Sequence, residues 1–281
     1  MKQLSLIGRI VLLFVFVQVF QAGAQNVNLK TRSTQIGINN EGYFSSIQVE
    51  GKDILHTGKY PLVTACTGNQ LVTPSKLTSS GNQLKLTMSD GGTISLKHKE
   101  SDVCITLEVA SIPEKYEVLL FGPLAVNINE VVGDVVSVAQ GNSVAFGIQA
   151  LNIKTNAGIP EEYGQLVTQT YGYSGKAAEL SVASIPDYKL AAADISDGTV
   201  FHFSARRRNK QEYRQVQGLN NSLVLPVEGA DGLIKGAKIA FFGSKNTEAL
   251  ARIGEIELEQ GLPHPLFDGE WGKTARAAMK S

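Results

Sequence analysis

The chain has 281 residues with 26 basic and 26 acidic side chains, so its formal net charge is zero. This balance provides no global field that would attract nucleic acid or an anionic membrane. Charged residues make up 19% of the chain and glycines number 28, a composition closer to a turn-rich β protein than to a helical bundle. The length fits one large β domain or two small ones.

Residues 1–24 have the pattern of a secretory signal peptide. Lys2 and Arg9 make the start basic, Ile10 to Phe20 is almost wholly apolar, and Ala22-Gly23-Ala24 supplies small residues for cleavage. The apolar run is shorter than the roughly 20 residues that span a bilayer, so we expect no stable membrane span. After cleavage near Ala24, the mature chain is expected in the periplasm or outside the cell.

Turn sequences divide the first hundred mature residues into hairpins. Asn39-Asn40-Glu41-Gly42 and Ser89-Asp90-Gly91-Gly92 contain residues that tolerate the positive φ of tight turns. Apolar and polar residues alternate beside these turns, which indicates strands with one buried and one exposed face. The strands predicted in this way are residues 36–38, 43–49, 84–88, 93–97 and 103–109.

The middle of the chain is more apolar than its start. Residues 116–121, 131–138 and 143–151 are β-branched or aromatic runs, and such runs are typical of strands buried on both faces. Later strands are predicted at residues 199–205, 223–226 and 234–242. Two antiparallel layers packed face to face accommodate the whole pattern, so we predict one large all-β sandwich over residues 25–245.

A helix is predicted over residues 246–261, packed on the sandwich. Asn246 or Thr247 can cap its start, Leu250, Ile253 and Ile256 share one face, and Gly261 can end it. Residues 262–281 contain two prolines and no predicted strand, and we interpret them as an extended linker toward a further domain.

The two cysteines, Cys66 and Cys104, both lie in strand-like apolar runs. They could pair in an oxidising compartment, or remain as two separately buried thiols. Sequence alone does not show whether their Cα atoms approach within bonding distance.

Aromatic residues beside acidic ones are the best candidates for ligand contact. Tyr163, Tyr171 and Tyr173 cluster in a region that we interpret as a glycine-rich loop, and Trp271 is the sole tryptophan. An aromatic ring beside hydrogen-bonding acids suits the faces and hydroxyls of a sugar. Trp271 could equally anchor the linker against the sandwich. The predicted substrate-binding residues are Trp271, Asp268, Glu270, Tyr171 and Tyr173.

Other motifs are weaker. The four histidines have no spacing that would direct two imidazoles at one metal, so neither a metal site nor a cofactor is predicted. Gly272-Lys273-Thr274 lacks the glycine that a phosphate-binding loop requires five positions earlier, where Phe267 stands. The basic run Arg206-Arg207-Arg208 could bind an anion, but a solvated loop explains it better. No catalytic residue is assigned.

Three stretches, residues 43–55, 121–155 and 234–274, carry a resemblance to a known family. They resemble the N-terminal β-sandwich module of large secreted bacterial glycoside hydrolases that degrade polysaccharides. The resemblance implies a galactose-mutarotase-like super-sandwich followed by a catalytic (β/α)8 barrel. It also implies that a mutarotase activity would need a His and a Glu in the concave sheet, a pair that we cannot place from the sequence.

These observations lead to one expected function and one alternative. The expected function is that of a non-catalytic sandwich of a secreted carbohydrate-active enzyme. Its expected partners are a barrel C-terminal to residue 281 and carbohydrate. Nucleic acid is not expected as a partner. The barrel would carry the two carboxylates of glycoside hydrolysis. The alternative is a free-standing carbohydrate-binding or surface-adhesion sandwich. An epimerase-like sandwich is a third reading.

Overall fold

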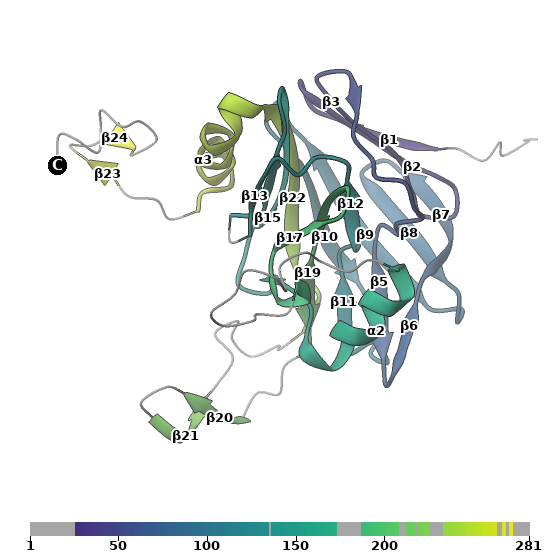
Figure 1. Cartoon of the computed structure of the whole chain (residues 1–281). Coiled ribbons are helices and arrows are strands. Elements are labelled where there is room, and N and C mark those ends of the chain that lie inside the picture. The colour runs from purple at the N-terminus through teal and green to yellow at the C-terminus, as the bar shows by residue number, and fades with distance from the viewer. Residues whose placement is uncertain are drawn as a thin grey trace, which may run out of the picture.

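The computed structural model describes residues 26–134, 136–172, 187–207, 212–216, 219–224, 233–262, 266–267 and 270–271. Over these residues the protein is mostly β, built from several antiparallel sheets with two α-helices, one of them C-terminal (Figure 1). The predicted all-β sandwich with a C-terminal helix is therefore confirmed. The predicted signal peptide lies outside the described residues.

One layer of the sandwich is an eight-stranded antiparallel sheet. β22 lies at its centre, although its neighbours β15 and β10 are distant from it in sequence. In spatial order the strands are β13 (Val131–Gly133), β14 (Val138–Gln140), β15 (Val144–Ala150), β22 (Lys238–Lys245), β10 (Ile105–Ser111), β9 (Thr93–Glu100), β8 (Gln83–Met88) and β7 (Pro74–Ser80).

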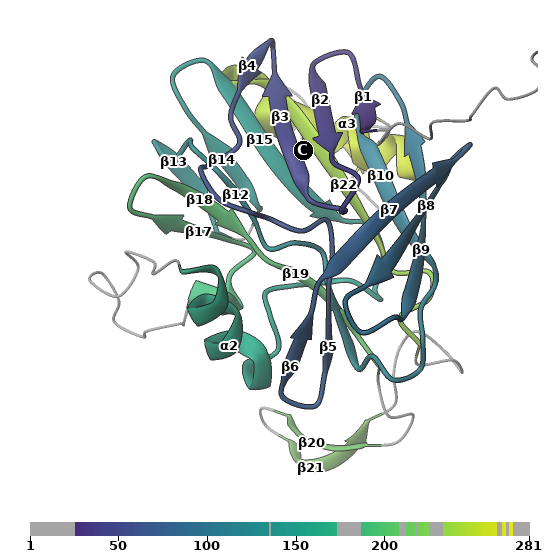
Figure 2. The ribbon, with the colours of Figure 1, turned by 90° about the vertical axis from the view of Figure 1, so that its right-hand side faces the viewer.

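Smaller sheets form the opposite layer, and Figure 2 shows the first and the third of those named here in front of the large sheet. The first contains β1 (Val27–Lys30), β2 (Thr34–Ile38), β3 (Phe44–Val49) and β4 (Lys52–Asp53). The second contains β16 (Asn156–Ala157), β19 (Phe203–Arg206), β11 (Val118–Leu120), β5 (Thr64–Thr67) and β6 (Gln70–Val72). The third contains β12 (Leu124–Val126), β18 (Gly198–Phe201) and β17 (Ala192–Ile195).

Two hairpins pair separately from these sheets. They are β20 (Glu212–Val216) with β21 (Leu219–Val224), and β23 (Leu266–Phe267) with β24 (Glu270–Trp271). The second hairpin corrects the expectation that residues 262–281 contain no strand. Between the two strands the sequence has Asp268-Gly269, a dipeptide typical of two-residue hairpin turns.

Aromatic side chains join the two layers. Phe44 on β3 packs edge-on against Phe241 on β22, with ring centroids 6.0 Å apart. Phe146 on β15 packs in the same manner against Phe201 on β18, at 5.6 Å. Each such contact contributes about 1 kcal/mol beyond the area it buries. The core is therefore continuous from the large sheet to the small ones.

The two helices cover the outer faces of the sandwich. The 3-10 turn η3 (Asn246–Glu248) leads into α3 (Ala249–Gln260), which ends at Gly261 in the left-handed conformation, φ 66°, as predicted. Ala249 and Ile256 pack against Phe242 and Ala145 on the outer side of the eight-stranded sheet.

The second helix was not predicted. α2 (Glu161–Tyr171) packs Tyr163 and Val167 against Cys66 and Val118 of the five-stranded sheet, and η2 (Asp187–Lys189) lies beside it. The interpretation of this region as a glycine-rich loop is wrong, because burial of one apolar side of the helix overrides its weak intrinsic propensity.

Two predicted strands are divided in the structure. Residues 131–138 form the two strands β13 and β14 around a turn. Residues 199–205 are interrupted at His202, whose backbone N–H bonds to Ala191 O, 2.9 Å away. At that residue the chain passes from the three-stranded sheet to the five-stranded one. A hydrophobic pattern does not report such a change of sheet, because both halves are equally buried.

Candidate functional site

The outward face of the four-stranded sheet carries an aligned row of polar side chains. Val27 and Leu29 on β1 are buried, so the alternation of the strand directs Lys30 to the outer face. The register places Lys30 opposite Gln35 of β2, and Gln35 opposite Gln48 of β3. Three long polar side chains from three neighbouring strands therefore stand side by side. We call Lys30, Gln35 and Gln48 the polar row.

The turns beside the polar row are held by hydrogen bonds. Thr31 Oγ1 accepts the backbone N–H groups of Ser33 and Thr34 at 3.2 and 2.9 Å. The Ser33 hydroxyl donates to Gly243 O at 2.6 Å, which attaches the β1–β2 turn to the other layer. The backbone N–H of Glu50 donates to Ser33 O at 2.8 Å. The two turns thus form one connected rim.

The turn between β3 and β4 has a demanding backbone conformation. Glu50 has φ 49° and Gly51 has φ 78°, the combination of a two-residue hairpin turn with positive φ at both positions. A non-glycine residue in the left-handed region costs about 1–2 kcal/mol. The hydrogen bond from Glu50 to Ser33 helps to hold this conformation.

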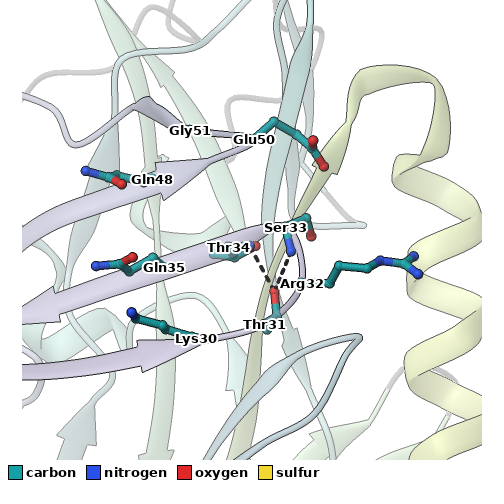
Figure 3. A pocket seen from close by; sticks show the side chains of 9 residues that line it. All are labelled: Lys30, Thr31, Arg32, Ser33, Thr34, Gln35, Gln48, Glu50 and Gly51. Carbon is teal, nitrogen blue, oxygen red and sulfur yellow. Dashed lines mark hydrogen bonds between the residues drawn. The ribbon is translucent and has the colours of Figure 1, made fainter.

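These elements enclose an open polar pocket of about 320 Å³. Figure 3 shows the polar row lying across the strands, with Arg32 extending away from it. The side chains of Lys30, Arg32 and Glu50 form no ion pair with another described residue. The pocket offers ammonium, guanidinium, amide and hydroxyl groups, which suits a hydroxylated ligand better than an apolar one. It is lined by Lys30, Thr31, Arg32, Ser33, Thr34, Gln35, Gln48, Glu50 and Gly51.

A second polar pocket of about 330 Å³ lies on the other side of β1. His98 and Glu100, two residues apart on β9, face it together, with His98 Nδ1 3.4 Å from Glu100 Oε1. This His–Glu pair was not predicted from the sequence. Residues two apart on a strand share a face, so their spacing is the signal that could have indicated it. Glu100 Oε2 accepts the backbone N–H of Lys30 at 2.8 Å, so this carboxylate already has a structural partner.

A chain of three side chains joins two loops elsewhere on the surface. His56 Nδ1 lies 2.7 Å from the Tyr60 hydroxyl, and His56 Nε2 lies 2.8 Å from Asp197 Oδ1. Tyr60 is only 5% exposed, and burial raises the pKa of its phenol, with the Asp197 carboxylate adding to the effect. The phenol is therefore buried and protonated, and the arrangement ties the β4–β5 connection to the β17–β18 turn.

The cysteines are separate buried thiols. Cys66 packs under α2 and Cys104 under α3, in different clusters, and both are free. Burial raises the pKa of Cys66 to about 12, assisted by Glu162 and Glu117. Burial and Glu259 raise the pKa of Cys104 to about 11, against smaller opposing effects of Ser101, Lys238 and Lys99. Of the two alternatives, the structure contains the unpaired one.

The residues predicted to contact sugar are only partly placed. Tyr171 is in the last turn of α2, half-buried, and its hydroxyl lies 3.0 Å from Thr64 Oγ1. Burial raises its pKa to about 12. Glu270 and Trp271 form β24, with Trp271 opposite Leu266 in the register. Tyr173 and Asp268 lie outside the described residues. Tyr163 is buried and donates to Glu117 Oε2, so it is not part of an exposed platform.

The basic run is engaged in structural contacts where it is described. Arg206 pairs with Glu162 of α2 at 3.2 Å. Arg207 donates to the carbonyl oxygens of Tyr116 and Pro113 at 2.9 and 3.0 Å. Arg206 belongs to strand β19 and not to a loop, but its side chain remains half exposed. The interpretation as a solvated loop is therefore corrected for Arg207, which two backbone carbonyls hold in place.

Within the described ranges, no three His, Cys, Asp or Glu residues come together as metal ligands. The helices described there are too short or too polar to cross a membrane. No protein family model matches the chain, and no curated protein matches it either. The fold and the site thus define a class of protein, an antiparallel β-sandwich with polar surface pockets of ligand size.

Proposed function

We propose that this chain is the non-catalytic β-sandwich module of a secreted carbohydrate-active enzyme of the glycoside hydrolase kind. The observation that supports the non-catalytic part is the composition of the two polar pockets. Each contains a single carboxylate, Glu50 in one and Glu100 in the other. Glycoside hydrolysis ordinarily requires two carboxylates that flank the glycosidic bond. The polar linings favour contact with hydroxylated ligands over bond cleavage.

The non-catalytic role is tested with purified residues 25–281. No reducing ends should be released from a panel of polysaccharides during prolonged incubation. Release that disappears in Glu50→Gln or Glu100→Gln would contradict the proposal, because it would show that one of these carboxylates acts on a glycosidic bond.

The expected partner is a (β/α)8 barrel C-terminal to this chain. α3 supports an interface with such a domain, because Leu250 and Leu258 are 66% and 43% exposed on the last described helix. Large apolar side chains on one helix are typical of a surface that another domain covers. The coding sequence after the codon for Ser281 should continue in frame into a barrel. A stop codon with no barrel sequence in any frame would count against this part.

The interface itself can be tested in the polypeptide that joins sandwich and barrel. Leu250→Ser with Leu258→Ser should lower the unfolding temperature of that polypeptide and leave isolated residues 25–281 unchanged. Val136→Ser is a matched control, since Val136 is 50% exposed in the β13–β14 turn, where Asp134 O accepts the backbone N–H of Ala191 from the opposite layer. An equal effect of the control variant would argue against a specific interface.

The second candidate is a free-standing carbohydrate-binding or adhesion sandwich. The specific observation in its favour is the polar row, whose side chains have no partner among the described residues. It predicts glycan binding by the mature chain without a downstream barrel. Trp271→Ala and Tyr171→Ala test the aromatic residues predicted from the sequence, and unchanged binding in both would remove them from the site.

A further inference from the structure

The polar row and its rim are arranged as a binding surface for an extended, negatively charged ligand. We propose that the outward face of β1–β3 binds an acidic glycan. The Lys30 ammonium contacts a carboxylate or sulfate group, and the amides of Gln35 and Gln48 contact ring hydroxyls. This inference rests on the proposed function, because it names the class of ligand that such a module would bind.

The register determines the direction of the ligand. Neighbouring strands lie about 4.8 Å apart, so the three polar ends span about 10 Å across the sheet. Because Lys30, Gln35 and Gln48 are direct cross-strand neighbours, the ligand runs perpendicular to the strands. An oligosaccharide fits this span, whereas a single sugar would reach only part of the row.

The side chains are available for a ligand. The ammonium of Lys30 and the amides of Gln35 and Gln48 make no hydrogen bond or ion pair to the described residues. Gln35 and Gln48 are half-buried at the level of the sheet, which limits the conformations that their stems can adopt. The hydrogen-bonded turns at Ser33 and Glu50 hold the backbone in place, so little ordering is required upon binding.

The local charge favours an anionic ligand. Lys30 and Arg32 contribute two positive charges to the pocket and Glu50 one negative charge. Glu100, the acidic residue next to β1, accepts the backbone N–H of Lys30 instead of pairing with its ammonium. A positive excess thus persists in this pocket although the whole chain has no net charge.

The pocket contains no aromatic residue among those that line it. No aromatic ring of this lining can therefore stack on a sugar face, and binding depends on hydrogen bonds and charge. Such binding weakens as salt is raised, because exposed charges are screened over about 10 Å at 0.1 M salt.

The test measures binding of purified residues 25–281 to matched pairs of glycans. Polygalacturonate is compared with its carboxyl-reduced product, and dextran sulfate with dextran, so that carboxylate and sulfate are distinguished. Binding is expected for at least one acidic member and weaker binding for its neutral counterpart. Lys30→Gln should raise the Kd for the acidic glycan by about threefold, and Gln35→Ala or Gln48→Ala by about fivefold each. Lys30→Arg should retain binding.

Matched controls lie on other parts of the surface. Lys85→Gln removes the same charge from an exposed position on β8, and Gln70→Ala removes an exposed glutamine of β6. Both should bind as the unmodified chain does. Far-UV circular dichroism and thermal unfolding of every variant confirm that the sandwich is folded.

The outcomes separate this inference from the function on which it rests. Loss of acidic-glycan binding in the polar-row variants, with intact controls, supports it. Three results overturn the site: binding that survives when Lys30→Gln, Gln35→Ala and Gln48→Ala are combined, binding to neutral glycans alone, or equal loss in the controls. Absence of all binding also overturns it. The proposed module function is judged independently by the downstream coding sequence and by the hydrolysis assay.

Discussion

The backbone N–H of Lys30 donates a hydrogen bond to Glu100 Oε2 over 2.8 Å. This bond joins β1 of the four-stranded sheet to β9 of the eight-stranded sheet, beside the pocket that contains the polar row. The position of the Lys30 side chain therefore depends on a carboxylate from the opposite layer. His98 lies against the other oxygen of the same carboxylate.

Removal of this carboxylate should loosen β1. We expect Glu100→Ala to lower the free energy of unfolding by about 1 kcal/mol, because the Lys30 N–H loses its acceptor. Glu100→Gln retains an acceptor oxygen and should have a smaller effect. Thermal unfolding measures both, with a shift of about 2–4 °C expected for the alanine variant. Glu114→Ala removes an exposed carboxylate without a described partner and should have no effect. Equal shifts in the two alanine variants would contradict this role.

His202 should make the fold sensitive to mild acid. Burial lowers the pKa of its imidazole to about 4, although backbone groups of Leu190 and Asp187 partly oppose the shift. The unfolded chain has an ordinary pKa near 6.5, so between pH 6.5 and 4 it takes up a proton that the folded chain does not. Stability should therefore fall as pH is lowered through this window, by up to about 3 kcal/mol.

Urea unfolding of the unmodified chain and His202→Asn at several pH values measures this effect. The variant should have a flatter pH dependence between pH 6.5 and 4.5, whatever its stability at pH 7.5. Asp90 contributes equally to the unmodified chain and to the variant, so it does not affect the comparison. Burial alone would raise its pKa, but hydrogen bonds from Lys115, Tyr116 and Gly92 lower it to about 2. An unchanged slope in His202→Asn would refute the assignment.

The thiols of Cys66 and Cys104 should be unreactive in the folded protein. Both are fully buried with raised pKa values, and the reactive thiolate is scarce at neutral pH. A colourimetric thiol reagent should detect no cysteine in the native chain and two after denaturation without reductant. Detection of none after denaturation would reveal a disulfide and contradict the structure.

Gly164 on α2 should not tolerate a methyl group. A Cβ at this position would lie 2.5 Å from Cε2 of the Tyr188 ring. Glycine to alanine normally stabilises a helix by about 1 kcal/mol, but overpacking costs about 1–3 kcal/mol, so we expect a net loss of stability. Chemical denaturation measures it.

The Tyr188→Ala background provides the control for this prediction. Once the ring is absent, Gly164→Ala should become stabilising, because only the helix propensity remains. A loss of stability of the same size in both backgrounds would show that the ring is not the cause.

Local features of the sequence determined the strands and turns that need only near neighbours. The turn at Asp90-Gly91 is one example, because the Asp90 carboxylate accepts the Gly92 N–H and the turn closes within its own hairpin. The end of α3 at Gly261 is another, since a glycine adopts the left-handed conformation without a partner. The C-terminal helix and the all-β class followed from the same local rules.

The tertiary structure alone decided the features that depend on distant residues. α2 is stable because Tyr163 and Val167 pack against Cys66 and Val118. Cys66 lies about a hundred residues earlier in the chain, and Val118 about fifty. Lys30 and Gln35 lie outside the strands predicted from the sequence, and their alignment with Gln48 required the register of three strands. That register is set by burial of the opposite face, where Phe44 packs against Phe241 of the other layer. A sequence pattern indicates on which face of a strand a residue lies, but not which residue lies beside it on the neighbouring strand.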